Sequence, residues 1–91
     1  MKTITVDFTN CKSYLQIHLY LKETFGFPDY YGKNLDALWD CMRDFCYSPA
    51  RILVKGIETL PEDLKGYAKE VLKVFDDLQE EDEEIIIEVM P

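Results

Sequence analysis

The amino-acid sequence predicts an α/β domain with two layers, in which a three-stranded parallel sheet is packed by about four helices. Three short segments have the pattern of strands, and the stretches of about forty and about thirty residues between them have mainly helical patterns. Such stretches are too long for hairpins, so crossover connections and parallel strands are expected. The first strand is apolar on one side only, which favours helices mainly on one face of the sheet.

The three predicted strands are short. Thr3 to Phe8 alternates between apolar and polar side chains, which is typical of a half-buried strand. Ile52 to Val54, enclosed by Arg51 and Lys55, indicates a short buried strand. The apolar run Ile85 to Val89 predicts the last strand.

Capping residues predict where the helices begin and end. Ser13 and Gln16 form a capping-box start, and Gly26 with a proline two positions later is a stop signal. Asn34 is a good N-cap for a second helix, which should end near residues 48–49. The apolar side of this helix contains Leu35, Leu38, Trp39, Met42, Phe45 and Cys46.

The remaining helical segments follow the second strand. Residues 59–62 have the cap, the early proline and the early acid of a helical turn, with Thr59 as the cap. A longer helix should follow directly, with apolar positions at Leu64, Ala68, Val71, Leu72, Phe75 and Leu78.

Length and cysteine content predict one domain, residues 1–91, without disulfides. A chain of 91 residues, 47% of them hydrophobic, can bury a single core. Cys11, Cys41 and Cys46 are odd in number and lack the CxxC spacing of metal or redox sites, which favours free thiols in a reducing cytosol. We expect no metal and no cofactor.

The charge is strongly acidic, with eighteen acids against ten bases and a net charge of −8. Such a chain repels phosphate backbones and anionic membrane surfaces and attracts basic partners. No apolar run is long enough to cross a bilayer. We therefore expect a cytoplasmic, monomeric protein that binds neither nucleic acid nor membranes directly.

Asp36 and Asp40 should lie on one face of the second helix, flanked by Trp39. Like charges at this spacing disfavour a helix by a few tenths of a kcal/mol. In one interpretation the helix N-terminus stabilises Asp36, and Asp40 pairs with Arg43. In others the two carboxylates bind a partner or form a catalytic acid–base pair, although no neighbouring group is visible that would separate their pKa values.

Two further features could contribute to binding. Tyr30 and Tyr31 offer flat contact surface, and we expect one of them to face outward, while Gly32 permits a turn or a close backbone approach. Residues 76–84 contain seven acids in nine positions, which oppose the helix dipole and so form either a solvated end or a field for a basic partner. The single histidine, His18, is expected to be structural.

The run PDYYGKNLDALWDCM, Pro28 to Met42, resembles the signature of the barstar family, small intracellular inhibitors of secreted ribonucleases. The segment VLKVFDD, Val71 to Asp77, also falls where that family would place it. The resemblance implies a barstar-like fold, which agrees with the sheet and helices predicted above. It also implies a protein that is not an enzyme.

In barstar-like proteins the second helix and the loop before it plug the cleft of a basic ribonuclease, with acids in the places of substrate phosphates. Carried over by resemblance, Asp40 would be the central acid and Asp36 would lie beside it, while Tyr30 would lie against the catalytic histidine. Asp77 would reach the rim of the cleft, with Glu81 nearby. The predicted binding residues are Tyr30, Tyr31, Gly32, Asn34, Asp36, Trp39, Asp40, Asp77 and Glu81.

The sequence departs from the family pattern at Lys33, at Arg43 with Asp44, at Phe45 and at Asp77, which is shorter than the family's glutamate. The two additional bases would weaken attraction to a very basic enzyme. An acidic binding module for another basic protein, such as a different toxin or a nucleic-acid-binding regulator, is therefore the alternative. A hydrolase is disfavoured, because acids on one exposed helix face do not flank a scissile bond.

Overall fold

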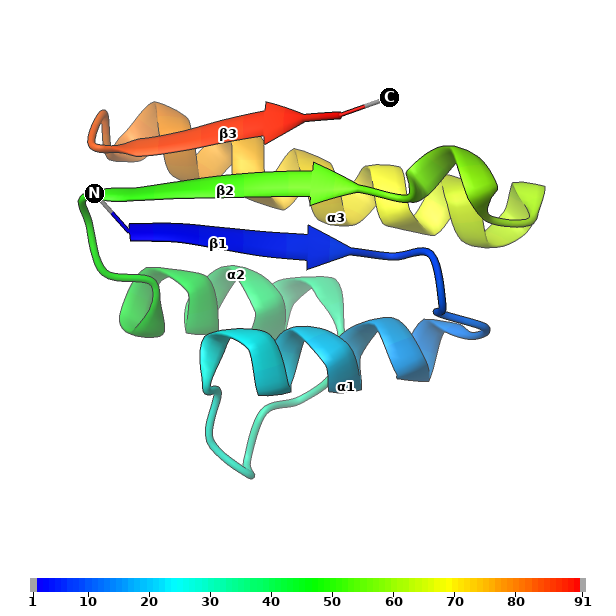
Figure 1. Ribbon diagram of the computed structural model, residues 1–91. Coiled ribbons are helices and arrows are strands. Elements are labelled where there is room, and N and C mark those ends of the chain that lie inside the picture. Colours follow the sequence, from blue (N-terminus) through cyan, green and yellow to red (C-terminus); the bar gives the residue numbers. More distant parts are fainter. Residues whose placement is uncertain (1, 91) are drawn as a thin grey trace.

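The computed structural model describes residues 2–90 of the chain. Strands and helices alternate along it as shown in Figure 1. The elements are β1 (Lys2–Asp7), α1 (Tyr14–Phe25), α2 (Leu35–Phe45), β2 (Ala50–Lys55), the 3-10 helix η1 (Ile57–Thr59), α3 (Glu62–Glu81) and β3 (Ile85–Val89). None of the helices in this part of the chain is both long and apolar enough to span a bilayer.

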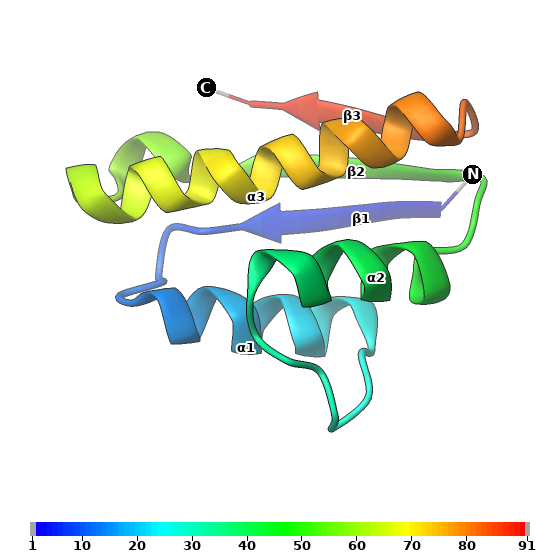
Figure 2. The ribbon, with the colours of Figure 1, turned by 180° about the vertical axis from the view of Figure 1, so that it is seen from behind.

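The three strands form one parallel sheet in the order β1-β2-β3, which confirms the predicted α/β fold. Val6, Val54 and Val89 stand in register across the sheet. The α3 helix lies behind the sheet in Figure 1 and in front of it in Figure 2. Three α-helices and one 3-10 turn accompany the strands, where the sequence predicted about four helices.

The core lies between the helices and one face of the sheet. Side chains on the covered face are buried, including Val6, Ile52, Val54 and Ile85. Side chains on the other face are exposed, including Thr3, Thr5, Arg51 and Lys55. The α3 helix contributes the buried residues Leu64, Ala68, Val71, Phe75 and Leu78. Full burial of one large apolar side chain stabilises a fold by about 1.5–3 kcal/mol, so this single core holds the domain together.

The predicted start and stop of α1 are both confirmed. The Ser13 hydroxyl accepts a hydrogen bond from the Gln16 N–H at 3.1 Å, and Gln16 Oε1 accepts one from the Lys12 N–H at 2.6 Å. Gly26 ends the helix in the left-handed region, with φ of 72°. That conformation costs other residues about 1–2 kcal/mol, which explains why a glycine stands here.

Two predicted helix boundaries are wrong. The α2 helix ends at Phe45 rather than near residues 48–49, because the backbone is already extended at Cys46, whose side chain is buried. The helical turn predicted to begin at Thr59 is also misplaced, because the 3-10 turn spans Ile57–Thr59 and Thr59 is its last residue. The Thr59 hydroxyl donates to the Gly56 carbonyl at 2.7 Å within the 3-10 turn, and α3 begins only at Glu62.

One side chain from each of α1 and α3 hydrogen-bonds to the backbone of an outer strand. The Tyr20 hydroxyl accepts a hydrogen bond from the Asp7 N–H of β1 at 2.9 Å. The side-chain oxygen of Gln79 accepts one from the Ile87 N–H of β3 at 2.6 Å. The N–H groups of Phe8 and Met90 donate to carbonyls at the end of β2. Successive N–H groups of a strand point to opposite sides, so those of Asp7 and Ile87 point away from β2.

Replacing Gln79 with alanine is expected to lower the free energy of unfolding by about 1 kcal/mol, because the partly buried Ile87 N–H would lose its acceptor. Urea denaturation followed by circular dichroism measures the change. Glu80→Ala is the matched control, since Glu80 is an exposed neighbour on the same helix. Equal losses in the two variants would contradict a specific role for the hydrogen bond.

Candidate protein-binding face

Asn34 fixes the loop that precedes α2. Its Oδ1 accepts a hydrogen bond from the Ala37 N–H at 2.8 Å, and its Nδ2 donates to the Gly32 carbonyl at 3.3 Å. A Cβ added to Gly32 would lie 3.1 Å from the Cβ of Ala37, so glycine allows the loop to approach the helix closely. Lys33, between them, is left-handed with φ of 54°. The predicted N-cap is confirmed.

Replacing Asn34 with alanine is expected to destabilise the protein by about 1 kcal/mol, because the first turn of α2 would lose its cap. Asn34→Asp should cost less, since aspartate caps helices equally well. Thermal unfolding of the two variants measures the difference. A loss as large in Asn34→Asp as in Asn34→Ala would mean that the Nδ2 bond to Gly32 matters more than the cap.

Asp36 and Asp40 are exposed one turn apart on α2. Within residues 2–90 neither belongs to an ion pair, and neither does Asp77 of α3. The interpretation in which Asp40 pairs with Arg43 is wrong, because Arg43 reaches across to Glu81 of α3 instead. The three aspartates therefore keep uncompensated charges at the surface.

A hollow of about 310 Å³ lies between α2 and α3. Asp36 and Trp39 line it from α2, and Asp77 lines it from α3, so the structure brings three predicted binding residues together. The other lining residues are Leu35, Glu70, Lys73 and Val74. Carboxylates beside an indole ring are suited to hold a guanidinium or ammonium group.

Arg43 links the last turn of α2 to the end of α3. Its guanidinium carbon lies 5.6 Å from the centroid of the Trp39 ring, and Nη2 lies 3.6 Å from Oε1 of Glu81. Both charged side chains are about half exposed, at 52% and 53%. Glu81, a predicted binding residue, is thus already in contact with a cation of its own chain.

The two loop tyrosines lie in opposite environments. Tyr30 is 79% exposed, whereas Tyr31 is only 2% exposed. The prediction that one of them faces outward is confirmed, and that residue is Tyr30. The side chain of Tyr31 belongs to the core, so it can serve the binding face only by positioning the loop.

His18 is the centre of a buried chain of hydrogen bonds that joins three parts of the fold. Its Nδ1 lies 2.6 Å from the Tyr31 hydroxyl, and its Nε2 lies 2.5 Å from the Tyr67 hydroxyl of α3. Burial lowers the pKa of His18 and raises the pKa of both tyrosines, so all three groups are neutral at neutral pH. The structural role predicted for His18 is confirmed.

The cysteines are free, as predicted, and all three are buried. Burial raises the pKa of the Cys41 thiol, and the negative charges of Asp44 and Asp40 raise it further. The negative charges of these two exposed aspartates therefore act on a thiol that is buried on the other side of α2. A raised pKa lowers the thiolate fraction, so Cys41 is poorly suited to nucleophilic chemistry.

Comparison with known proteins assigns the chain to a family. Residues 1–90 match the family model described as "Barstar (barnase inhibitor)". The chain belongs to the barstar family. A protein of Bacillus subtilis (strain 168) named "Putative ribonuclease inhibitor YrdF" is 42% identical over 81 residues, which cover 89% of each chain. The family resemblance noted in the sequence is confirmed.

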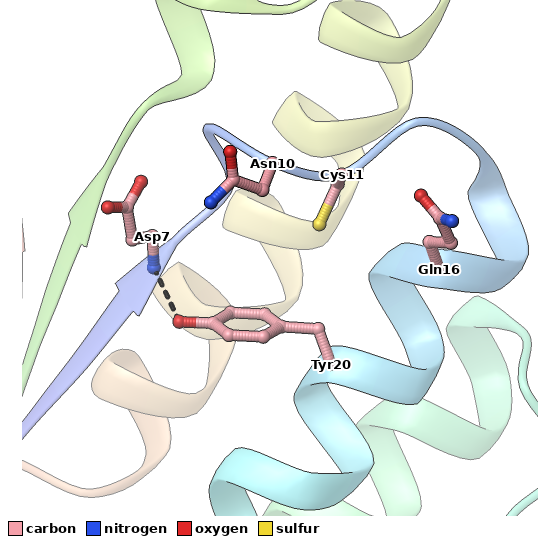
Figure 3. Close-up of a pocket in the computed structure, with 5 residues that line it drawn as sticks. All are labelled: Asp7, Asn10, Cys11, Gln16 and Tyr20. Atoms are coloured by element: carbon pink, nitrogen blue, oxygen red, sulfur yellow. Dashed lines mark hydrogen bonds between the residues drawn. The ribbon is translucent and has the colours of Figure 1, made fainter.

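Another hollow of this barstar-family chain, of about 440 Å³, lies at the carboxyl end of β1 (Figure 3). Its polar groups serve the fold. The Tyr20 hydroxyl accepts the Asp7 N–H, the Asp7 carboxylate accepts the N–H and the hydroxyl of Thr9, and Gln16 accepts the Lys12 N–H. The lining residues are Asp7, Asn10, Cys11, Gln16 and Tyr20. The hollow between α2 and α3, called the groove below, is therefore the better candidate site. Its aspartates, Asp36 and Asp77, form no ion pair within residues 2–90.

Glu70 and Lys73 line the groove but were not predicted from the sequence. Together with Asp77 they stand at positions i, i+3 and i+7, which places them on one side of α3. That spacing could have predicted from the sequence that Glu70 and Lys73 lie on the same side of the helix as Asp77. The barstar resemblance drew attention to Asp77 and Glu81 on this helix, whereas the spacing extends the set of surface residues by two turns toward the start of α3.

Proposed function

We propose that this barstar-family chain is a protein inhibitor of a ribonuclease. The exposed side of α2 and the loop before it enter the active-site cleft, where carboxylates take the places of substrate phosphates. Asp40 and Asp36 supply the central charges, Asp77 meets the rim of the cleft, and Tyr30 lies against the enzyme. The observation that carries the proposal is the group of three exposed aspartates that have no ion-pair partner within residues 2–90.

Stability accounts for only one of these aspartates, because Asp36 lies in the first turn of α2, where the helix N-terminus favours a carboxylate. Asp36 and Asp40 repel one another at i, i+4, which costs a helix a few tenths of a kcal/mol. A basic cleft would supply the missing countercharges on binding. The net charge of −8 would also steer the chain toward such a partner and raise the association rate. The family description and the name of the Bacillus subtilis relative support a ribonuclease as that partner.

Two further properties belong to the proposal. The inhibitor acts in the cytoplasm, since three free buried thiols suit a reducing compartment. It acts as a monomer and without catalysis. It makes no direct contact with nucleic acid, because its net negative charge repels phosphate backbones.

The proposal is tested by titrating the protein into barnase and a panel of secreted bacterial ribonucleases and measuring residual RNA cleavage. Activity of at least one enzyme should disappear at one equivalent of inhibitor. Association should slow steeply as salt is added, because exposed charges are screened. The absence of inhibition across the panel at micromolar concentration would contradict the proposal.

Three basic side chains near the exposed aspartates support a second candidate function, a binding module for another basic protein. Lys33 and Arg43 flank the aspartates in sequence, and Lys73 lines the groove. These charges disfavour a very basic cleft and could select a different target. Capture of a partner from a lysate distinguishes the candidates, since a partner without ribonuclease activity favours the second one.

A further inference from the structure

Arg43 is a cation that lies beside two of the predicted binding residues on the surface formed by α2 and α3. Its guanidinium lies next to the ring of Trp39 and the carboxylate of Glu81. The family resemblance predicts that both of these residues bind the partner. By contrast, Lys73 lines the groove without an ion pair inside the described chain. Arg43 therefore occupies positions that a basic group of a partner would otherwise use.

The stability of the fold does not explain the contact of Arg43 with Glu81. The pair is half exposed and its N···O distance is 3.6 Å, so it is screened by solvent and contributes little to folding. Its effect on the surface is larger, because one of the four predicted binding acids is neutralised. Of these four, Asp36, Asp40 and Asp77 have no ion-pair partner among residues 2–90.

Resting on the proposed function, we propose that Arg43 is a specificity-determining residue of the binding face. It holds Glu81 and the ring of Trp39 within the chain, so the face accepts basic groups at the three free aspartates and disfavours them at the C-terminal end of α2. A partner with a cation directed at Glu81 must displace the guanidinium. A partner with a carboxylate or carbonyl there gains the guanidinium N–H groups that Glu81 leaves unused.

The first test needs no ribonuclease. A tetra-arginine peptide is titrated into the wild type and into Arg43→Ala at 0.15 M salt, with binding followed through the fluorescence of Trp39, the only tryptophan. Arg43→Ala should bind the peptide about 3- to 10-fold more tightly, because Glu81 and the indole ring become free. The gain should shrink in the Glu81→Gln background. Arg43→Gln, which keeps a polar side chain but removes the positive charge, should behave like Arg43→Ala.

The chain offers a matched control in Arg51. It forms an ion pair of similar exposure with Glu88 on the uncovered face of the sheet, at 2.9 Å. Arg51→Ala changes the net charge by the same amount but should leave peptide affinity within about 2-fold of wild type at 0.15 M salt, where distant charges are screened. Equal gains in Arg51→Ala and Arg43→Ala, or no gain in Arg43→Ala, would overturn the proposal.

The second test uses each ribonuclease that the wild type inhibits. Arg43→Ala should raise the association rate about 3- to 10-fold for the more basic enzymes of the panel and change it less for the others. A uniform change across enzymes would overturn the role in specificity. If the wild type inhibits no ribonuclease, the proposed function fails, while the peptide titration still decides whether Arg43 withholds Glu81 and Trp39 from cations.

Discussion

Replacing Asp40 with alanine is expected to weaken inhibition of a cognate ribonuclease by about 30-fold to 5,000-fold, which corresponds to a loss of about 2–5 kcal/mol. Asp40 is exposed in the free protein and lacks an ion pair among the described residues, so removing it costs the fold little. In the complex the same change would leave the enzyme's cations buried without a countercharge. Inhibition constants from RNA cleavage assays measure the loss.

Asp63→Ala is the matched control for this substitution. Asp63 is exposed in the first turn of α3 and lines a different hollow, near the start of α1. The control removes the same charge from the whole molecule but not from the binding face, so it should change inhibition by less than about 3-fold at 0.15 M salt. Similar losses in the two variants would reduce the role of Asp40 to its contribution to net charge.

Lowering the pH below 6.5 is expected to destabilise the protein through His18. Burial lowers the pKa of His18 from its ordinary value of 6.5, so the folded chain excludes a proton that the unfolded chain accepts. Stability should therefore fall as the pH falls from 6.5 toward the lowered pKa, by at most about 1.4 kcal/mol per pH unit. From about one pH unit above 6.5 the histidine is almost entirely neutral in both states and its contribution is constant.

His18→Gln isolates this contribution, because glutamine can still hydrogen-bond to Tyr31 and Tyr67 but does not titrate. Urea denaturation of both proteins between pH 7.5 and 5 should show the slope in the wild type only. Asp7 and Asp29 do not interfere, since hydrogen bonds from Thr9 and Lys22 lower their pKa values below 3.8. An equal slope in His18→Gln would assign the pH dependence to other groups.

Much of the fold could be predicted because its signals are local. The cap at Ser13, the stop at Gly26 and the N-cap at Asn34 each depend on groups within a few residues, and each is present in the structure. Thr59 has no such unique partner. Its hydroxyl could serve the helix ahead or the carbonyl behind, and the 3-10 turn that leads out of β2 favours the Gly56 carbonyl.

The sequence predicted some of the residues that line the candidate site, but not Glu70 and Lys73, and not which charged groups form ion pairs. Arg43 could have met Asp40 on its own helix or Glu81 on α3, and only the packing of the two helices brings it to Glu81. The adjacent tyrosines are chemically identical. The side chain of Tyr31 points inward and its hydroxyl hydrogen-bonds to His18 of α1. The sequence near the two tyrosines does not indicate which of them has this partner.

The hydrogen bonds of Tyr20 and Gln79 have a consequence for protein chains that meet one another. A three-stranded sheet has two edges, and an unpaired N–H on an edge is a template to which another chain can add a strand. Here the outward N–H of Asp7 on one edge and that of Ile87 on the other already donate to helix side chains. A second chain must displace these bonds to pair with the sheet at Asp7 or at Ile87, so each edge is already occupied at one position.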